Sequence, residues 1–114
     1  MLESKFQAKL IKEIKKQLPG CVVLKTDPNY IQGFPDLLVL YGKTWAALEC
    51  KKSSTAAHRP NQNYWVKRLQ QMSFAKFIWP ENKEEVINAM DRSLKRFSKR
   101  ESHFVLPEPT GLEK

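Results

Sequence analysis

The spacing of apolar residues predicts a helix at each end of the chain. Over residues 2–18 an apolar side chain recurs at every fourth position, and Pro19-Gly20 ends this helix. A second helix is predicted near the other end, where Asn82 and Glu85 have the spacing of a capping box. Five apolar residues share one face of that helix: Val86, Ile87, Met90, Leu94 and Phe97.

Between these helices the pattern changes to short apolar runs, which predict strands over residues 21–25, 37–41, 44–51 and 75–79. The second and third strands are apolar on both faces, which indicates a central position in the sheet with cover on each side. Pro60 opens a helix from about Asn61 to Gln71, which would bury Trp65, Leu69 and Met72. The chain is therefore predicted to be a single α/β domain, a mixed four-stranded sheet flanked by helices in the order α-β-β-β-α-β-α.

The turn Gly42-Lys43 determines how the second and third strands pair. A two-residue loop with glycine first is typical of a type II′ hairpin turn, so Tyr41 would face Thr44. Counting outward from that pair places Asp36 directly across from Glu49. Opposed carboxylates with Cβ atoms about 5 Å apart repel each other, by on the order of 3 kcal/mol at an effective dielectric of about 20. Such a pair persists when one carboxyl group is protonated or when a cation lies between them.

Lys51 adds a cation to these acids, because strand alternation places it on the same face as Glu49 and turns Cys50 to the other face. Oxygen ligands favour Mg²⁺ or Mn²⁺, and no His or Cys spacing in the sequence resembles a zinc site. Such a metal binds phosphate oxygens and lowers the pKa of water, and a lysine can orient that water or offset charge on the phosphate. The constellation predicts phosphodiester hydrolysis, and the alternative is a strand-end cluster of ion pairs.

The charge of the chain indicates the class of partner. The 114 residues include 20 Lys and Arg against 12 Asp and Glu, a net charge of +8. A chain this basic favours nucleic acid first and an anionic membrane surface second, with general solubility as the alternative. No apolar run is long enough to span a membrane, and the N-terminus lacks the pattern of a signal peptide. Cys21 and Cys50 lie in apolar, strand-like segments, so we expect reduced thiols and a cytoplasmic protein.

Several short motifs together resemble a known nuclease superfamily. Gly33-Phe34-Pro35-Asp36, the hairpin, and Glu49-Cys50-Lys51 resemble the motif of the PD-(D/E)XK nucleases. Pro60-Asn61-Gln62, followed by Trp65 and Leu69, is similar to stand-alone VRR-NUC domains, which are relatives of Holliday junction resolvases. The resemblance spans about residues 2–90 in the same order of elements, and it implies a restriction-endonuclease-like core.

The resemblance also implies roles for the residues of the hairpin. Asp36 and Glu49 would be metal ligands, with the backbone carbonyl of Cys50 as a third, and Lys51 would be the catalytic lysine. The family often has Val or Ile in the position of Cys50, a departure that leaves the ligand set intact.

Two residues outside the hairpin complete the implied site. Glu3 matches the acid on the first helix of the family, as a further metal ligand, and its place beside the apolar stripe directs its carboxylate towards the sheet and away from bulk solvent. The alternative is an acid favoured in a first helical turn by the macrodipole. Gln62 matches the glutamine on the helix after the lysine strand, near the metal or the DNA backbone, and the alternative is a helix-capping or solvated side chain.

Residues and resemblance together predict a Mg²⁺-dependent DNA endonuclease, with Mn²⁺ able to substitute, and the resemblance implies selectivity for branched DNA such as a Holliday junction. A junction with two-fold symmetry requires two active sites, and hence a homodimer. The alternative is a basic DNA-binding accessory protein without turnover. Basic residues that flank the site in the sequence are the predicted phosphate contacts: Lys5, Lys9, Lys12, Arg59, Lys67 and Arg68.

The remaining assignments concern aromatic residues and the tail. Trp79 and Tyr64 have the chemistry to stack on bases, but core packing is the expected role for both. His58 has the chemistry to assist near the phosphate, but a lone loop histidine is expected to be simply exposed. Periodicity is lost from Ser98 onward, so residues 1–97 are the predicted nuclease domain and residues 98–114 an extension, either flexible or an oligomer arm.

Overall fold

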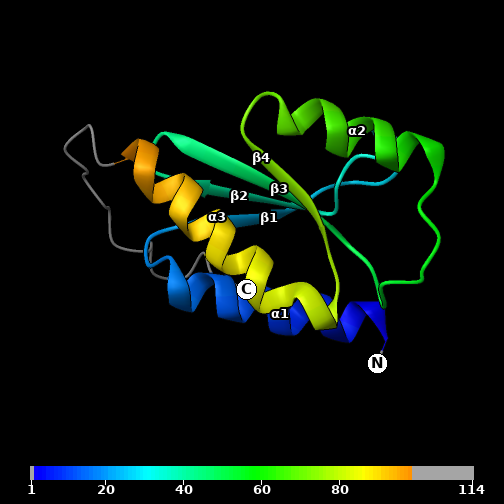
Figure 1. Cartoon of the computed structure of the whole chain (residues 1–114), viewed down its shortest axis with the longest axis horizontal. Coiled ribbons are helices and arrows are strands. Elements are labelled where there is room, and N and C mark those ends of the chain that lie inside the picture. The colour runs from blue at the N-terminus through cyan, green and yellow to red at the C-terminus, as the bar shows by residue number, and fades with distance from the viewer. Residues whose placement is uncertain (1, 99–114) are drawn as a thin grey trace.

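The computed structural model describes residues 2–98, in which a four-stranded sheet lies between helices (Figure 1). The order of elements expected from the sequence is confirmed, with a short 3-10 helix, η1, added before the last helix. The predicted C-terminal extension lies outside the described residues, apart from Ser98, which ends the last helix. The elements are α1 (Glu3–Gln17), β1 (Val22–Lys25), β2 (Leu37–Tyr41), β3 (Thr44–Cys50), α2 (Pro60–Gln70), β4 (Phe74–Ile78), η1 (Pro80–Asn82) and α3 (Lys83–Ser98).

The sheet is mixed, with the strands in the order β1-β2-β3-β4. The first three strands pair antiparallel, and β4 pairs parallel to β3 after the crossover through α2. In the hairpin Tyr41 pairs with Thr44 and Leu37 with Leu48, which confirms the register counted from the turn. Gly42 has a φ of 59°, and Lys43 has no positive φ, as a type II′ turn requires and a type I′ turn does not allow.

Helices cover the two faces of the sheet unequally. On one face α1 and α3 pack side by side over the sheet, and Leu10, Ile14 and Met90 are fully buried there. On the other face α2 lies over β3 and β4, where it buries Val66 and Leu69. Each fully buried side chain of this kind stabilises the fold by about 1.5–3 kcal/mol. None of the described helices is long and apolar enough to cross a membrane.

The expectation that both hairpin strands are covered on each side is wrong for β2. Because α2 lies over β3 and β4 only, the outer half of that sheet face has no helix over it within residues 2–98. Val22 and Leu24 of β1 are 49% and 45% exposed, and Leu40 of β2, which pairs with Val22, is 38% exposed. The central position of β2 and β3 is nevertheless confirmed by the strand order.

Three local expectations are also corrected. Met72 is 58% exposed, because α2 ends at Gln70 and the turn carries Met72 away from the buried stripe. Phe97 is exposed in the last turn of α3, beyond the buried Leu94. Asn82 does not form the expected capping box with Glu85. Its side chain turns back to the end of β4, where it accepts a hydrogen bond from the amide of Trp79 at 2.7 Å.

Candidate active site

Asp36 is held at the start of β2 by contacts on both sides. The amide of Thr26 donates to the Asp36 carbonyl at 2.9 Å, and the Thr26 hydroxyl donates to the carbonyl of Pro35 at 2.7 Å. The Asp36 carboxylate accepts a hydrogen bond at Oδ2 from the amide of Cys50 at 2.9 Å. The side chain of Asp36 is therefore fixed against Cys50 at the end of β3. Cys50 directly follows Glu49 in the sequence.

The loop that delivers Asp36 packs directly against the start of α2. Gly33 has a φ of 82°, and a Cβ built on it would lie 2.8 Å from the backbone carbon of Asn61. Only glycine combines that backbone conformation with such a close approach. One residue later, Phe34 packs edge-on against Trp65 with ring centroids 5.3 Å apart. The loop and the helix that carries Gln62 thus form one packed unit.

Gln62 connects the acid and the base of the candidate site. Its Nε2 donates to Oε2 of Glu49 at 2.9 Å, and its Oε1 accepts from Nζ of Lys51 at 2.6 Å and from the amide of Arg59 at 3.1 Å. Lys51 Nζ also donates to the carbonyl of Ala57 at 2.9 Å and lies 3.9 Å from Glu49 Oε2. The helix-capping alternative for Gln62 therefore describes one of its contacts, and the same amide also joins Glu49 to Lys51.

The site lies at the buried end of β3, and its carboxylates are electrostatically coupled. Glu49 is only 3% exposed, and Lys51 is 7% exposed. Burial first and the Asp36 carboxylate second raise the pKa of Glu49 to about 8, against the lowering effect of Lys51. Burial also raises the pKa of Asp36, although the Cys50 amide and Lys51 lower it in part. When both carboxyl groups are ionised, the pair thus carries negative charge that the surrounding groups only partly offset.

Glu3 is exposed at the first residue of α1, which corrects the expectation that it is shielded from bulk solvent. Partial burial first and the nearby Asp36 second raise the pKa of its carboxyl group, while Lys51 and Lys52 lower it. Across residues 2–98, no three His, Cys, Asp or Glu side chains come together as a group that could hold a metal ion. Glu3 stays a predicted ligand, and its carboxyl group interacts electrostatically with those of Asp36 and Glu49.

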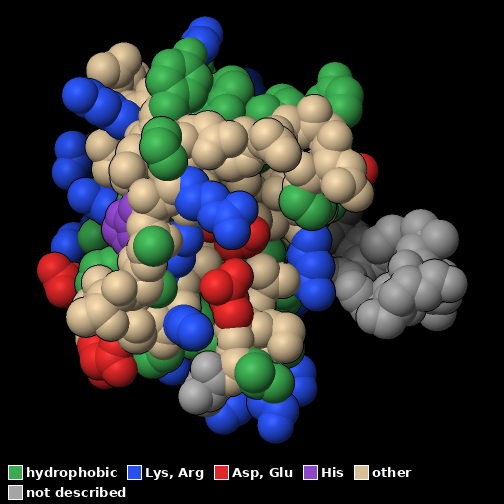
Figure 2. Space-filling view, turned by 90° about the vertical axis from the view of Figure 1, so that its right-hand side faces the viewer, with side chains coloured by type: hydrophobic (Ala, Val, Ile, Leu, Met, Phe, Trp, Pro, Cys, Tyr) green, Lys and Arg blue, Asp and Glu red, His purple; other side chains and the backbone are tan. Residues whose placement is uncertain are grey.

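The predicted phosphate contacts are all exposed and lie on two helices and the loop before α2. Figure 2 shows acidic side chains near the middle of one face of the molecule, with Lys and Arg side chains around them. Arg68 is less free than the others, because its guanidinium donates to the Tyr64 hydroxyl at 2.8 Å and lies over the Trp65 ring. These contacts stay predictions: Lys5, Lys9 and Lys12 on α1, Arg59, and Lys67 and Arg68 on α2.

Several positioning groups have no pattern in the sequence. The Ala57 carbonyl that receives Lys51 belongs to an aperiodic loop, and Thr26 would be found only by extending the strand register outward. Burial first and the Asp36 carboxylate second raise the pKa of the Cys50 thiol, which the Gln7 side chain lowers only in part. Cys21 and Cys50 are both buried and free, so neither is in a disulfide.

The architecture has a counterpart among solved structures. A structure described as a VRR_NUC domain protein superposes with a TM-score of 0.64 at 17% sequence identity, covering 83% of this chain and 89% of that chain. No family model and no curated protein matches the sequence. Likeness at this identity identifies the fold. The α/β fold expected for this chain, a mixed four-stranded sheet flanked by helices, is thus confirmed as one that a VRR_NUC domain protein also has.

Proposed function

We propose that the protein is a Mg²⁺-dependent endonuclease that hydrolyses phosphodiester bonds in DNA, with Mn²⁺ able to replace Mg²⁺. The observation that carries the proposal is the convergence of Asp36, Glu49 and Lys51 at one end of the hairpin, with Gln62 joining the acid to the base. The fold shared with a VRR_NUC domain protein supports nuclease chemistry. The net charge of +8 supports a polyanionic substrate.

The donor set is compatible with Mg²⁺. That ion is usually held by one or two carboxylates together with water and substrate phosphates, so a ready-made cluster of three acids is not required. Asp36 and Glu49 would supply the two carboxylates and Cys50 its backbone carbonyl, with Glu3 as the proposed further ligand. The raised pKa values of Asp36 and Glu49 support this assignment, because a nearby cation favours the ionised carboxylates.

The protein groups would position the reactants. When bound, the ion would supply positive charge to the phosphate and a water of lowered pKa. Lys51 would donate a hydrogen bond to that water or to a phosphate oxygen, stabilising charge that develops in the transition state. Gln62 and the Ala57 carbonyl hold the ammonium group of Lys51 beside Glu49, so the lysine is oriented before DNA arrives.

We further propose that the substrate is branched DNA, such as a four-way junction, and that the active form is a homodimer. Two-fold related sites suit a junction whose two scissile strands are symmetric. The uncovered half of the sheet supports a partner copy, because Val22, Leu24 and Leu40 form an exposed apolar surface there. The exposed basic residues of α1 and α2 would contact phosphates, which predicts steep dependence of binding on salt and little dependence on sequence.

A second candidate function is a DNA-binding accessory protein without turnover. One observation favours it: Lys51 Nζ already has two hydrogen-bond acceptors and a carboxylate at 3.9 Å, as a purely structural lysine would. In that case Asp36 and Glu49 would be structural acids, and binding would need no metal.

A nicking assay on supercoiled plasmid separates the two candidates. Wild type should nick in Mg²⁺ and not in EDTA, and Asp36→Ala and Lys51→Ala should both be inactive. Lys52→Ala is the matched control, since it removes the exposed neighbouring lysine outside the hydrogen-bond network. Equal nicking by wild type, Asp36→Ala and Lys51→Ala would refute the proposed nuclease activity. A panel of four-way junction, flap, splayed arm and linear duplex then tests substrate choice, and equal cleavage of all four would refute selectivity for branched DNA.

A further inference from the structure

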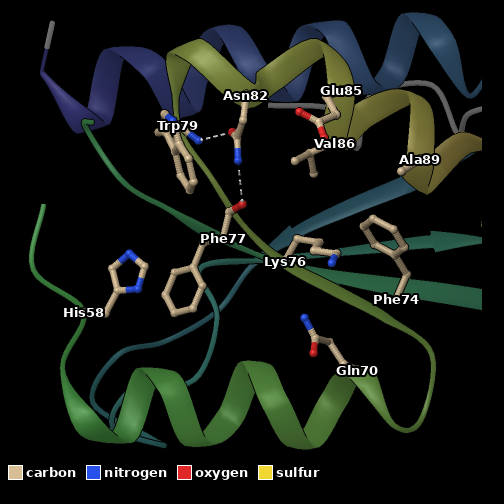
Figure 3. A pocket seen from close by; sticks show the side chains of 10 residues that line it. All are labelled: His58, Gln70, Phe74, Lys76, Phe77, Trp79, Asn82, Glu85, Val86 and Ala89. Atoms are coloured by element: carbon tan, nitrogen blue, oxygen red, sulfur yellow. Dashed lines mark hydrogen bonds between the residues drawn. The ribbon is translucent and has the colours of Figure 1, made fainter. Parts of the chain in front are cut away.

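A groove of about 420 Å³ runs along the outer edge of β4, between α2 and α3 (Figure 3). Four of its lining side chains are flat rings, from His58, Phe74, Phe77 and Trp79. Figure 3 shows His58 and Phe77 side by side with Trp79 above them, at one end of the groove. β4 is the last strand of the sheet, so no other strand in the described part of the chain covers this edge.

The backbone along this edge is already capped by side chains. Gln70 donates from Nε2 to the Ala75 carbonyl at 2.9 Å, and Asn82 donates from Nδ2 to the Phe77 carbonyl at 3.3 Å. Asn82 also accepts from the Trp79 amide. An edge whose Ala75 and Phe77 carbonyls already accept hydrogen bonds from side chains is less suited to adding a further strand, which needs free C=O as well as N–H groups. The groove therefore suits a ligand recognised by side chains.

The charge and shape of the lining favour a flat, uncharged ligand. Lys76 and Glu85 are the charged residues that line the groove, and their charges cancel, unlike the cation cluster that a phosphate site needs. His58 stacks on Phe77 with ring centroids 3.9 Å apart and the planes 10° apart. Nε2 of His58 is shielded from solvent and has no hydrogen-bond partner within residues 2–98. The ring is thus held by stacking while its Nε2 stays without a partner in the described part of the chain.

The groove adjoins the candidate active site through the backbone. Phe77 is the register partner of Glu49 across the parallel pair of β3 and β4, and neighbouring strands lie about 4.8 Å apart. His58 precedes Arg59, whose amide donates to Gln62. Groups bound at the His58 end of the groove would therefore lie close to a phosphate bound at Asp36 and Glu49.

We propose that this groove binds an unpaired nucleobase of the DNA strand whose phosphate lies at the active site. The inference rests on the proposed nuclease function and deepens it, because it assigns the recognition of branched or unpaired DNA to a definite surface. Bases stack on aromatic side chains whatever their sequence, and a base paired within a duplex cannot reach the groove without leaving its stack. An intact duplex would then lack this contact.

The test measures binding in EDTA, where cleavage is prevented, with 2-aminopurine as the unpaired base of a flap. Wild type should quench the fluorescence of the unpaired probe, and should bind the flap about tenfold more tightly than a flap with an abasic site at that position. His58→Ala and Trp79→Leu should lose both the quenching and this tenfold preference, while duplex binding changes less than about twofold. Phe97→Ala is the control, because Phe97 is a 57% exposed aromatic residue of α3 outside the groove.

Two further measurements keep the result interpretable. His58→Phe restores a ring that can stack on Phe77, so it should retain the preference if His58→Ala loses it for the proposed reason. Wild type that shows no preference for the base over the abasic site, or groove variants that keep it, would overturn the inference. A change in oligomeric state of His58→Ala and Trp79→Leu, with base preference retained, would instead assign the groove to a second copy of the chain and overturn it as well.

Failure of the inference is distinguishable from failure of the proposed function. Nicking of plasmid in Mg²⁺ without any base preference would leave the nuclease proposal standing and would refute the proposed binding of a base in the groove. Base preference without any nicking would retain the groove as a DNA-binding site and refute the enzyme.

Discussion

Replacing Glu49 with glutamine should stabilise the protein at alkaline pH while removing the proposed nuclease activity. The pKa of Glu49 is raised from 4.5 to about 8, so the folded protein binds this proton more tightly than the unfolded chain does. The folded state therefore holds more protons across this window, and the free energy of unfolding falls as the pH rises through it. Glutamine removes the charge whose burial causes the loss, and its side-chain oxygen can still accept the hydrogen bond from Gln62.

The size of the effect follows from the difference between the two pKa values. Taken in full, the rise from 4.5 to about 8 is worth about 5 kcal/mol, and allowing for relaxation and water penetration around the buried carboxylate leaves about 2 kcal/mol. For a domain of this size that is about 8 °C in melting temperature. Glu49→Gln and wild type should melt together near about pH 5, and the variant should melt about 8 °C higher at about pH 9 in EDTA.

Thermal melts across this pH range are the assay, with Glu84→Gln, an exposed acid on α3, as the matched control that should show no pH-dependent gap. Adding Mg²⁺ at about one hundred times its dissociation constant should raise the stability of wild type by about 2.7 kcal/mol at about pH 8 and should not stabilise Glu49→Gln. A difference in melting temperature between Glu49→Gln and wild type that does not grow with pH would refute the claim that burial of the Glu49 charge destabilises the fold. A variant less stable than wild type at high pH would refute it as well.

Three further predictions concern packing, orientation and assembly. Gly33→Ala should destabilise the fold by about 2–3 kcal/mol in chemical denaturation, because alanine is disfavoured at a positive φ and its Cβ would also clash with Asn61. Gly42→Ala, at the exposed turn, should lose only the stability that the positive φ costs. Gln62→Ala should lower kcat by about 10–100-fold with little change in melting temperature, since it releases Lys51 from the site without opening the core; unchanged kcat would reduce Gln62 to a helix cap. Leu24→Lys should yield monomers in sedimentation while leaving the melting temperature of the monomer unaltered, and an undisturbed dimer would exclude the uncovered sheet face as its interface.

The hairpin was predictable from the sequence because a two-residue turn permits exact counting. Once Gly42-Lys43 is identified, strand periodicity alone places Asp36 opposite Glu49 and turns Lys51 to the same side. This local geometry does not depend on how the rest of the chain packs. The order of elements was predictable for the same reason, since each was indicated by its own short pattern.

The remaining parts of the site depend on packing that sequence periodicity does not specify. Nothing along the chain indicates that α2 lies over β3 and β4 only, which leaves Leu24 and Leu40 exposed. The path of the loop before α2 determines that the Ala57 carbonyl meets Lys51, and that loop has no periodic pattern. The carboxylate of Glu3 was expected to face the sheet and away from bulk solvent, yet Glu3 is the first residue of α1, where the helix end leaves it open to solvent.

The close approach of Gly33 to Asn61 bears on how the proposed DNA substrate would be recognised. The loop before Asp36 is held against α2 by this contact and by the Phe34–Trp65 packing, so it is in place before a substrate binds. A site built in advance leaves the bending and unstacking to the nucleic acid, at an energetic cost that depends on how deformable the DNA already is. A branch point is bent and partly unstacked before it meets the protein, whereas a continuous duplex must be deformed on binding. The rigid packing of the loop before Asp36 would thus favour binding of DNA that is already bent or flexible over binding of a continuous duplex.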